Sequence, residues 1–185
     1  MLTKPIKFAD CNHCTLFNRP LVFGAFSGNG KPLLVGEAPG FDEVLAGIPF
    51  IGRAGELLNE LLFLYGLDRR ELNITNACIC HPVTEDEKQN RPPTFAEMDC
   101  CSGRLLESIQ RIKPPITIAL GKSAYYALTG EKIDKLALVA GVKTKTRNGF
   151  KLIATYHPAA ALRSNSYRIP LERDLKELSH AAAEA

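Results

Sequence analysis

Short apolar or β-branched segments alternate with longer segments of helical spacing, and this alternation limits the possible folds more than any other feature. The short segments cover residues 32–36, 72–78, 116–120 and 152–156. Helical spacing of apolar residues covers 53–66, 94–112, about 122–128 and a stretch from about Pro170 onward. Strands that are apolar along their length are typical of a parallel sheet covered by helices on both faces. The sequence therefore predicts an α/β fold with a mainly parallel central sheet.

The length of 185 residues suits one domain, which we expect to span residues 1–185. No apolar run reaches the roughly 18 residues that a membrane span requires, and residues 1–10 lack the apolar stretch of a signal peptide. We therefore expect a cytoplasmic monomer with no membrane partner. The formal net charge of +3 permits an acidic partner such as nucleic acid but does not demand one.

Three polar features stand where predicted strands end. The Gly/Pro-rich turn at residues 36–40 follows the first strand, Asn76 lies near the end of the second, and His157 follows the last. Ligands bind at the carboxyl ends of the strands in open parallel sheets. We therefore expect an active site at this edge, formed where the three features converge.

Six cysteines in a reducing compartment favour metal or cluster ligation over a disulfide framework. Cys11 and Cys14 form a C-x2-C pair, but the chain has no second C-x2-C and no histidine pair of the kind that zinc sites favour. An iron–sulfur cluster takes four thiolates from scattered segments. The simpler alternative is buried thiols that pack as small apolar groups, and we favour it for Cys78 and Cys100.

Several motifs, in one order along the chain, resemble those of the family 4 uracil-DNA glycosylases. The first is the turn 36–40, which is followed by residues 47–55, Gly-Ile-Pro-Phe-Ile-Gly-Arg-Ala-Gly. The others are the segment 74–76 with Cys80, then residues 90–94, 119–121 and 155–160. Each motif alone is a weak signal, but together they extend from about residue 11 to 163, which is nearly the whole chain.

This resemblance implies a three-layer α/β/α sandwich and an enzyme of DNA repair. The enzyme would hydrolyse the N-glycosidic bond of a flipped-out uracil in uracil-containing DNA and leave an abasic site; such an enzyme would be nucleoid-associated when it acts on DNA. The resemblance also implies a [4Fe-4S] cluster that ties an N-terminal segment to the rest of the domain. The expected ligands are Cys11, Cys14, Cys80 and Cys101.

The resemblance assigns roles at the predicted sheet edge. His157 would donate to uracil O2, Asn76 would read O4 and N3–H, and Phe50 would stack on the base. From residue type alone, the alternatives are a surface or capping histidine, a turn asparagine and a core phenylalanine. The turn would approach uracil with its backbone at Glu37, Ala38 and Pro39. Ala38 replaces the water-activating aspartate of other uracil glycosylases, which leaves Glu37, Glu43 or Asn90 to position the water, and we favour Glu37.

The chain departs from the family pattern after Cys80, where His81-Pro82-Val83 and the polar stretch 84–89 replace the usual basic residue and prolines. It departs again at Ala161, where relatives often carry leucine, so that the wedge replacing the flipped base would shift to Leu162. Glu43 has a second interpretation, in which it crowds uracil C5 and excludes thymine. The candidates for DNA contact are Arg53, Lys122, Leu162 and Arg163.

Three related alternatives remain: a relative that binds uracil-DNA covalently through a histidine, a glycosylase for another base such as a deaminated purine, and a non-catalytic iron–sulfur DNA-binding protein. The polar insert 84–89 lacks the arginine-rich string that the covalent relative carries. A nucleotide-binding Rossmann protein is disfavoured, because no G-x-G-x-x-G follows any predicted strand.

Overall fold

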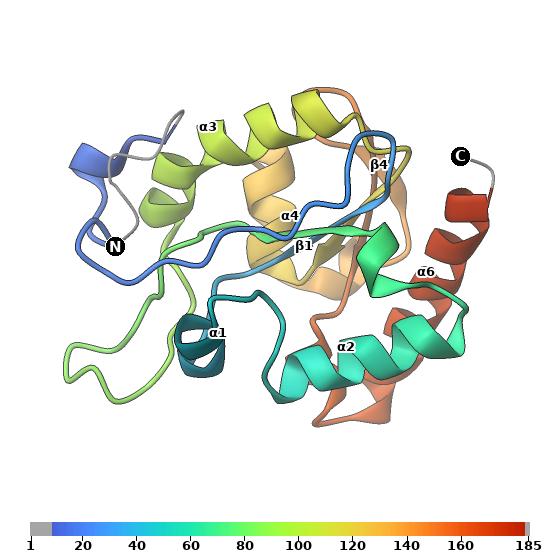
Figure 1. Cartoon of the computed structure of the whole chain (residues 1–185), viewed down its shortest axis with the longest axis horizontal. Coiled ribbons are helices and arrows are strands. Elements are labelled where there is room, and N and C mark those ends of the chain that lie inside the picture. Colours follow the sequence, from blue (N-terminus) through green and yellow to red (C-terminus); the bar gives the residue numbers. More distant parts are fainter. Residues whose placement is uncertain (1–8, 184–185) are drawn as a thin grey trace.

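The computed structural model describes residues 9–183, with side chains to Ser179 in the last helix. Residues 1–8 and 184–185 of the predicted domain lie outside the described residues. A five-stranded sheet in the order β2-β1-β3-β5-β4 forms the centre (Figure 1). The strands are β1 (Leu33–Gly36), β2 (Asn73–Asn76), β3 (Thr117–Leu120), β4 (Lys143–Lys145) and β5 (Lys151–Thr155). The first four in spatial order are parallel, and β4 pairs antiparallel with β5.

Helices cover both faces of this sheet. They are α1 (Phe41–Ala46), α2 (Arg53–Leu64), α3 (Phe95–Ile112), α4 (Lys122–Thr129), α5 (Pro158–Ala161) and α6 (Asn165–Ala183). Three short 3₁₀ turns, Cys11–His13, Arg69–Glu71 and Leu136–Leu138, lie between them. Helices α3 and α4 pack on one face, whereas α2 and α6 pack on the other (Figure 1). The expected three-layer α/β/α arrangement is therefore confirmed.

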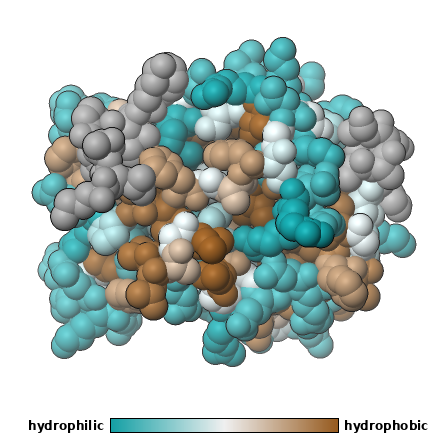
Figure 2. Space-filling view, viewed as in Figure 1, coloured by the Kyte–Doolittle hydropathy of each residue, from teal (hydrophilic) through white to brown (hydrophobic). Residues whose placement is uncertain are grey.

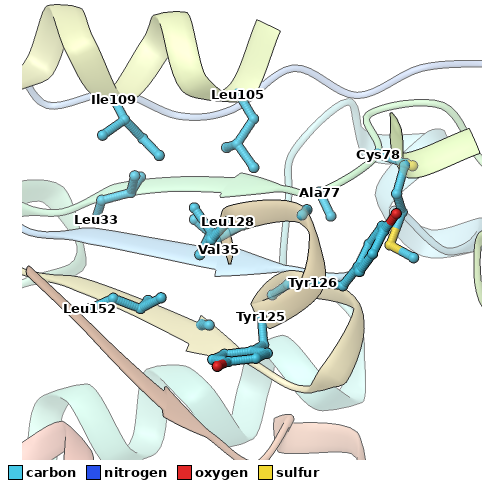
Figure 3. Packing of buried hydrophobic residues seen from close by; sticks show 14 of the residues in the cluster. Leu33, Val35, Ala77, Cys78, Leu105, Ile109, Tyr125, Tyr126, Leu128 and Leu152 are labelled. Atoms are coloured by element: carbon cyan, nitrogen blue, oxygen red, sulfur yellow. The ribbon is translucent and has the colours of Figure 1, made fainter. Parts of the chain in front are cut away.

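Alternate residues of β1 pack in two separate cores, because successive side chains of a strand point to opposite faces of the sheet. Leu33 and Val35 pack with Leu105 and Ile109 of α3, as Figure 3 shows. Leu34 instead packs in the core that α2 and α6 cover. Every residue of β1, β2 and β3 is buried. This double burial explains why the strands lack the polar alternation of a half-exposed sheet.

Most predicted elements are present within a residue or two, including the capping box of α3. The Thr94 hydroxyl accepts from the Glu97 amide at 3.2 Å, and the Glu97 carboxylate accepts from the Thr94 amide at 2.7 Å. The predicted start of the last helix is wrong: α6 begins at Asn165 and contains Pro170. The Ser164 hydroxyl accepts from the Ser166 amide at 3.2 Å, so a capping side chain starts this helix one turn before the proline.

The surface carries exposed apolar side chains near one end of the sheet. Figure 2 shows apolar surface over α1 and the segment that follows it, where Phe41, Leu45, Ile48 and Ile51 are exposed. The sequence analysis predicted no helix at α1, since its six residues are too short for a clear period. Among the helices within residues 9–183, none has both the length and the hydropathy of a membrane span.

Leu105→Ala tests the packing of α3 on the sheet. Leu105 is fully buried, so we expect its truncation to lower the free energy of unfolding by about 2–5 kcal/mol. Leu138→Ala is the matched control, because Leu138 is 70% exposed and should change this free energy by less than about 0.5 kcal/mol. Urea unfolding of both variants measures the difference, and equal midpoints would contradict the core assignment.

Candidate active site and cysteine cavity

Phe50 and Asn76 meet above Gly36 at the carboxyl end of β1. Gly36 pairs in register with Asn76, the last residue of β2. A Cβ at Gly36 would overlap both the Phe50 ring and Asn76 Oδ1. Both side chains are largely buried, with exposed fractions of 5% and 3%. Only glycine therefore allows an aromatic face and an amide to lie together at this point.

The backbone of Phe50 is held in an unusual conformation. Its φ of 55° lies in the left-handed region, which costs a non-glycine residue on the order of 1–3 kcal/mol. The guanidinium of Arg69 donates to the Phe50 carbonyl at 3.1 Å and to the Pro49 carbonyl. Gly55 leaves room for the same carbonyl, because a Cβ there would overlap it. These contacts stabilise the strained backbone at Phe50 and so hold its ring over Gly36, at the carboxyl end of β1.

His157 lies two residues beyond β5, and its ring stacks on Phe50. The ring centroids are 5.7 Å apart at an interplanar angle of 27°. Nδ1 accepts a hydrogen bond from the Ala159 amide at 3.1 Å, so the neutral ring carries its proton on Nε2. Burial, aided by the charge of Arg163, lowers the pKa of His157 from 6.5 to about 4. At neutral pH this side chain is therefore an uncharged donor.

Glu37 follows Gly36 in the turn, and its carboxylate contacts the segment that follows the end of β3. The Ser123 hydroxyl donates to Glu37 Oε2 at 2.5 Å, while Glu37 and His157 line the same cleft. Pro39 is buried, and Ala38 packs against the α3 side of the core. The structure thus brings the predicted turn to the same edge as the predicted histidine, with one carboxylate held by a serine.

Glu43 and Asn90 lie together on the other side of this turn. Glu43 accepts from the Gly40 amide at 3.0 Å and from the amides of Ile51 and Gly52, each at 3.3 Å. The Asn90 amide nitrogen would lie 3.0 Å from a Cβ at Gly40. The carboxylate of Glu43 therefore joins α1 to the segment that carries Phe50, since three backbone donors share its two oxygens.

A cleft of about 780 Å³ opens beside His157 and Glu37. Of the four predicted DNA contacts, Lys122 and Arg163 line this cleft. Arg53 begins α2 and is exposed outside it, and Leu162 is 44% exposed at the end of α5. The structure therefore groups two of these candidates at the cleft and places the other two outside its lining.

All six cysteines line one small cavity beneath the N-terminal segment, and the members of this cysteine cavity are Cys11, Cys14, Cys78, Cys80, Cys100 and Cys101. Within it Cys14 hydrogen-bonds with Cys100, and Cys78 with Cys101. The bond to Cys78 lowers the pKa of Cys101 to about 5 and, together with burial, raises that of Cys78. The four expected cluster ligands are thus brought together, and so are the two cysteines predicted to be bystanders.

Within residues 9–183, no three His, Cys, Asp or Glu side chains form a group that could hold a metal ion. Thiolates on one zinc ion must lie within about 4.6 Å of each other, because each Zn–S bond is about 2.3 Å. A four-iron cluster binds each thiolate at a different iron and needs wider spacing. Apart from the carboxylate of Glu97, which Arg91 and Thr15 bind, the donors that line this cavity are all sulfur and are not arranged for a single ion.

Glu97 connects the walls of the cysteine cavity. Its carboxylate accepts from both terminal nitrogens of Arg91, at 2.6 and 2.8 Å, and from the Thr15 hydroxyl at 2.6 Å. Burial raises the pKa of Glu97, but these bonds and the one from Thr94 outweigh burial and hold it at about 2. This buried carboxylate therefore binds the N-terminal segment and the β2–α3 connection to α3.

Arg104 lies behind the cavity and is only 8% exposed. Its guanidinium donates to the Asn76 carbonyl at 2.8 Å, to the Ala77 carbonyl at 3.3 Å and to the Thr75 hydroxyl at 3.4 Å. It also hydrogen-bonds with the sulfur of Cys101. Nε is buried without a partner among the described residues. Among the described residues no carboxylate is bonded to this buried cation, which contacts both the sulfur of Cys101 and the carbonyls of Asn76 and Ala77.

Four residues that the sequence analysis did not single out for this site take part in its geometry. Arg69 holds the Phe50 turn, Ser123 holds Glu37, and Arg104 holds the end of β2. His81, noted only as a departure, lies 2.7 Å from Asn90 Oδ1 through Nε2 and packs edge-on against Phe41. Ser123 could have been found, because it follows Gly121 at a predicted strand end. The other contacts depend on tertiary packing that no spacing reveals.

Chemically, the edge offers three complementary groups within one small space. Phe50 presents an aromatic face, Asn76 an amide with one donor and one acceptor side, and His157 an uncharged ring donor. Such a site suits a planar heterocycle with a polar edge. A neutral donor at its rim can stabilise negative charge that develops on the ligand.

The model of the uracil DNA glycosylase superfamily matches residues 23–179 of this chain. A type-4 uracil-DNA glycosylase of Archaeoglobus fulgidus is 36% identical over 177 residues, 91% of this chain and 86% of the relative. A type-4 enzyme of Thermotoga maritima is 37% identical over 159 residues, 84% and 80% of the two chains. A type-5 uracil-DNA glycosylase of Pyrobaculum aerophilum is 29% identical over 172 residues, 85% and 73% of the two chains.

The ring of His157 should stay neutral well below its ordinary pKa. We expect nitrogen-15 NMR of the labelled ring to give a pKa near 4, with Nδ1 unprotonated above it. Because the unfolded chain binds this proton near pH 6.5, the free energy of unfolding should fall as the pH decreases from 6.5 to 4 and should not change through this group above 6.5.

His157→Gln identifies the signal, and the urea-unfolded wild type supplies the reference titration. A folded-state pKa of 6.5 or higher would contradict the uncharged ring.

Proposed function

The chain belongs to the uracil DNA glycosylase superfamily, and we propose that it is a DNA-repair glycosylase that hydrolyses the bond between uracil and deoxyribose in DNA. One observation carries this proposal: Phe50, Asn76 and His157 converge over a glycine at the carboxyl edge of the sheet. Such a site is too enclosed to take a stacked base. The target nucleotide must therefore leave the duplex before its glycosidic bond can be reached.

Asn76 supplies the base discrimination in this proposal. Its amide reads uracil O4 through N–H and uracil N3–H through the carbonyl oxygen, while the Phe50 ring packs on the base. Cytosine presents the opposite pattern at these two positions, which leaves buried polar groups unpaired. Discrimination by such a fixed polar contact reaches about 10⁴-fold. Arg104 donates to the backbone carbonyl of Asn76, and the Asn76 side chain is buried. Both features restrict alternative orientations of this residue.

His157 acts on the leaving group. As the glycosidic bond breaks, its electron pair moves onto uracil, and negative charge develops at O2. The Nε2–H of His157 donates to that oxygen, and the bond from the Ala159 amide to Nδ1 fixes this tautomer. A neutral donor serves here because the ring keeps its single proton at neutral pH.

Water completes the hydrolysis by adding to C1′ of the sugar. Glu37 is our candidate to orient this water, since it lies in the cleft beside His157 and Ser123 fixes one of its oxygens. Glu43 is less suited, because backbone amides already bond to both of its oxygens. Asn90 then contributes through its position beside Gly40, where His81 orients its amide.

We further propose that the cysteine cavity holds the [4Fe-4S] cluster, with Cys11, Cys14, Cys80 and Cys101 as its ligands. Two observations favour this fit: the donors are sulfur apart from the Glu97 carboxylate, which Arg91 already binds, and the buried cation of Arg104 lies beside Cys101 with Nε unpartnered among the described residues. Four thiolates bring the negative charge that a buried guanidinium requires. The cluster supplies a structural cross-link between the N-terminal segment, the loop after β2 and α3.

His157→Ala tests the proposed reaction. We expect single-turnover excision of uracil from an oligonucleotide to fall about 10²–10³-fold, since one donor to the developing anion is lost. Binding to uracil-DNA should change little, because this bond strengthens mainly in the transition state. Phe63→Ala is the control, as the Phe63 ring is 87% exposed on α2 and does not line the cleft. Excision by His157→Ala within threefold of wild type would place leaving-group stabilisation elsewhere.

Arg104→Met tests the charge balance at the cysteine cavity. We expect the purified variant to retain less iron per chain than wild type and to unfold more easily by about 1–3 kcal/mol, as two carbonyls lose a buried donor. Iron analysis and absorbance near 400 nm report the cluster, and urea unfolding reports stability. Arg111→Met is the control, because Arg111 is exposed on the same helix. Iron content equal to that of the control would contradict the pairing of Arg104 with the cluster.

A further inference from the structure

The cleft beside the uracil site is far larger than one base requires. Its volume is about 780 Å³, and it extends from Glu37 and His157 across the start of α4 to the segment 132–137 and the first residue of α3. Neither Phe50 nor Asn76 lines it, so the space lies outside the base-reading site but opens into it. Whatever occupies this cleft is therefore continuous with the substrate at His157.

The charges of the cleft suit a polyanion. Its cationic lining residues are Lys122, Lys132, Lys135 and Arg163, and its acidic ones are Glu37 and Asp134. Glu37 is held by the Ser123 hydroxyl. The Lys122 ammonium donates weakly to the Asp134 carbonyl at 3.4 Å. This bond connects the segment 132–137 to the start of α4. Cations thus line both walls of a cleft whose acidic groups are fewer.

An exposed aromatic ring, that of Phe95, also lines the cleft. Phe95 is 46% exposed, although it is the first residue of a helix where a polar residue would cost nothing in packing. Its ring packs edge-on against Tyr126, with centroids 4.5 Å apart, and Tyr126 in turn donates to Asp99 at 2.9 Å. The ring is therefore held in place from one side while much of its surface is open to solvent.

Lys132 lies over this ring, with Nζ 4.5 Å from the centroid. A cation on an exposed ring strengthens an interaction only about two- to fivefold, whereas a nucleobase stacked on an aromatic side chain strengthens binding about 5- to 150-fold. A base can therefore displace Lys132 from Phe95. The displaced ammonium stays at the cleft wall, where it can bind the phosphate of the same nucleotide.

We propose that this cleft binds the unpaired DNA strand beside the target uridine, with a neighbouring base stacked on Phe95 and the phosphates on Lys132 and Lys135. This inference rests on the proposed glycosylase function and adds a second base site to it. In a duplex the neighbouring base is paired and stacked, so Phe95 contributes when the substrate is single-stranded or locally open. The cleft therefore favours uracil in unpaired DNA.

The test measures binding and excision separately. Binding is followed by fluorescence anisotropy on a single-stranded oligonucleotide with one 2′-fluoro-deoxyuridine, which resists cleavage of its glycosidic bond. Three oligonucleotides are compared: an intact one, and two in which a tetrahydrofuran abasic nucleotide replaces the base on the 5′ or the 3′ side of the uridine. The protein is the full chain with its cluster, as wild type, Phe95→Ala and Phe95→Trp.

We expect wild type to lose at least about fivefold in affinity on one of the two abasic oligonucleotides. Phe95→Ala should lose a similar factor on the intact oligonucleotide and no more on the abasic one, whereas Phe95→Trp should keep wild-type affinity. Lys132→Ala combined with Lys135→Ala should weaken binding to all three oligonucleotides and reduce its salt dependence. With duplex substrate, Phe95→Ala should excise uracil within about twofold of wild type.

The controls lie away from the cleft. Phe63→Ala removes a ring that is 87% exposed on α2, and Lys151→Ala removes an exposed lysine at the amino end of β5. Both should match wild type on every oligonucleotide. Uracil excision by wild type with equal affinities for Phe95→Ala and wild type would overturn this inference alone. Absence of uracil excision by wild type from any substrate would overturn the proposed function and this inference with it.

Discussion

The close contact of Phe50 and Asn76 over Gly36 is the constraint on which the rest of the site depends. It exists only because β1 ends in a residue without a side chain, in register with the last residue of β2. It also requires Phe50 to adopt a positive φ, a strain that the Arg69 bonds and the space at Gly55 allow the chain to maintain. Two distant stretches of sequence thus stabilise one conformation of one ring.

The second strand connects this site to the cysteine cavity over a very short distance along the chain. Asn76 ends β2, Cys78 and Cys80 follow at once, and Arg104 bonds to the carbonyls of Asn76 and Ala77 while lying beside Cys101. Order in the cavity and order at the Asn76 amide therefore depend on the same buried guanidinium. Through this guanidinium the proposed cluster would affect the proposed reaction without taking part in bond cleavage.

The sheet, its two cores and the edge that carries the site could be predicted from the sequence, because fully buried strands and long amphipathic helices leave a strong pattern. Helix α1 and strand β4 could not, since six residues show no clear period and the exposed Lys-Thr-Lys of an edge strand has no apolar signal. The sequence predicts the wrong start for α6, since a proline favours the first turn of a helix, whereas Ser164 caps this helix six residues before Pro170.

Two kinds of signal in the sequence indicate site residues: the ends of predicted strands and the motifs of the family. His157, Asn76 and the turn at 36–40 follow from strand ends alone, whereas the role of Phe50 and the choice of four cysteines as proposed ligands follow from the resemblance. Arg69, Arg104 and Ser123 act through contacts that join segments 19 to 86 residues apart, which no local pattern encodes. Their roles are visible only once the chain is folded.

Release of the free base is the most direct test of uracil excision by this protein. Wild-type protein is incubated with a single-stranded oligonucleotide that contains one uridine, and mass spectrometry follows both the free base and the DNA. We expect free uracil and abasic DNA in equal amounts, with no release of a base from the matched thymidine or cytidine oligonucleotide. Intact DNA, or a protein–DNA adduct formed without free uracil, would contradict it.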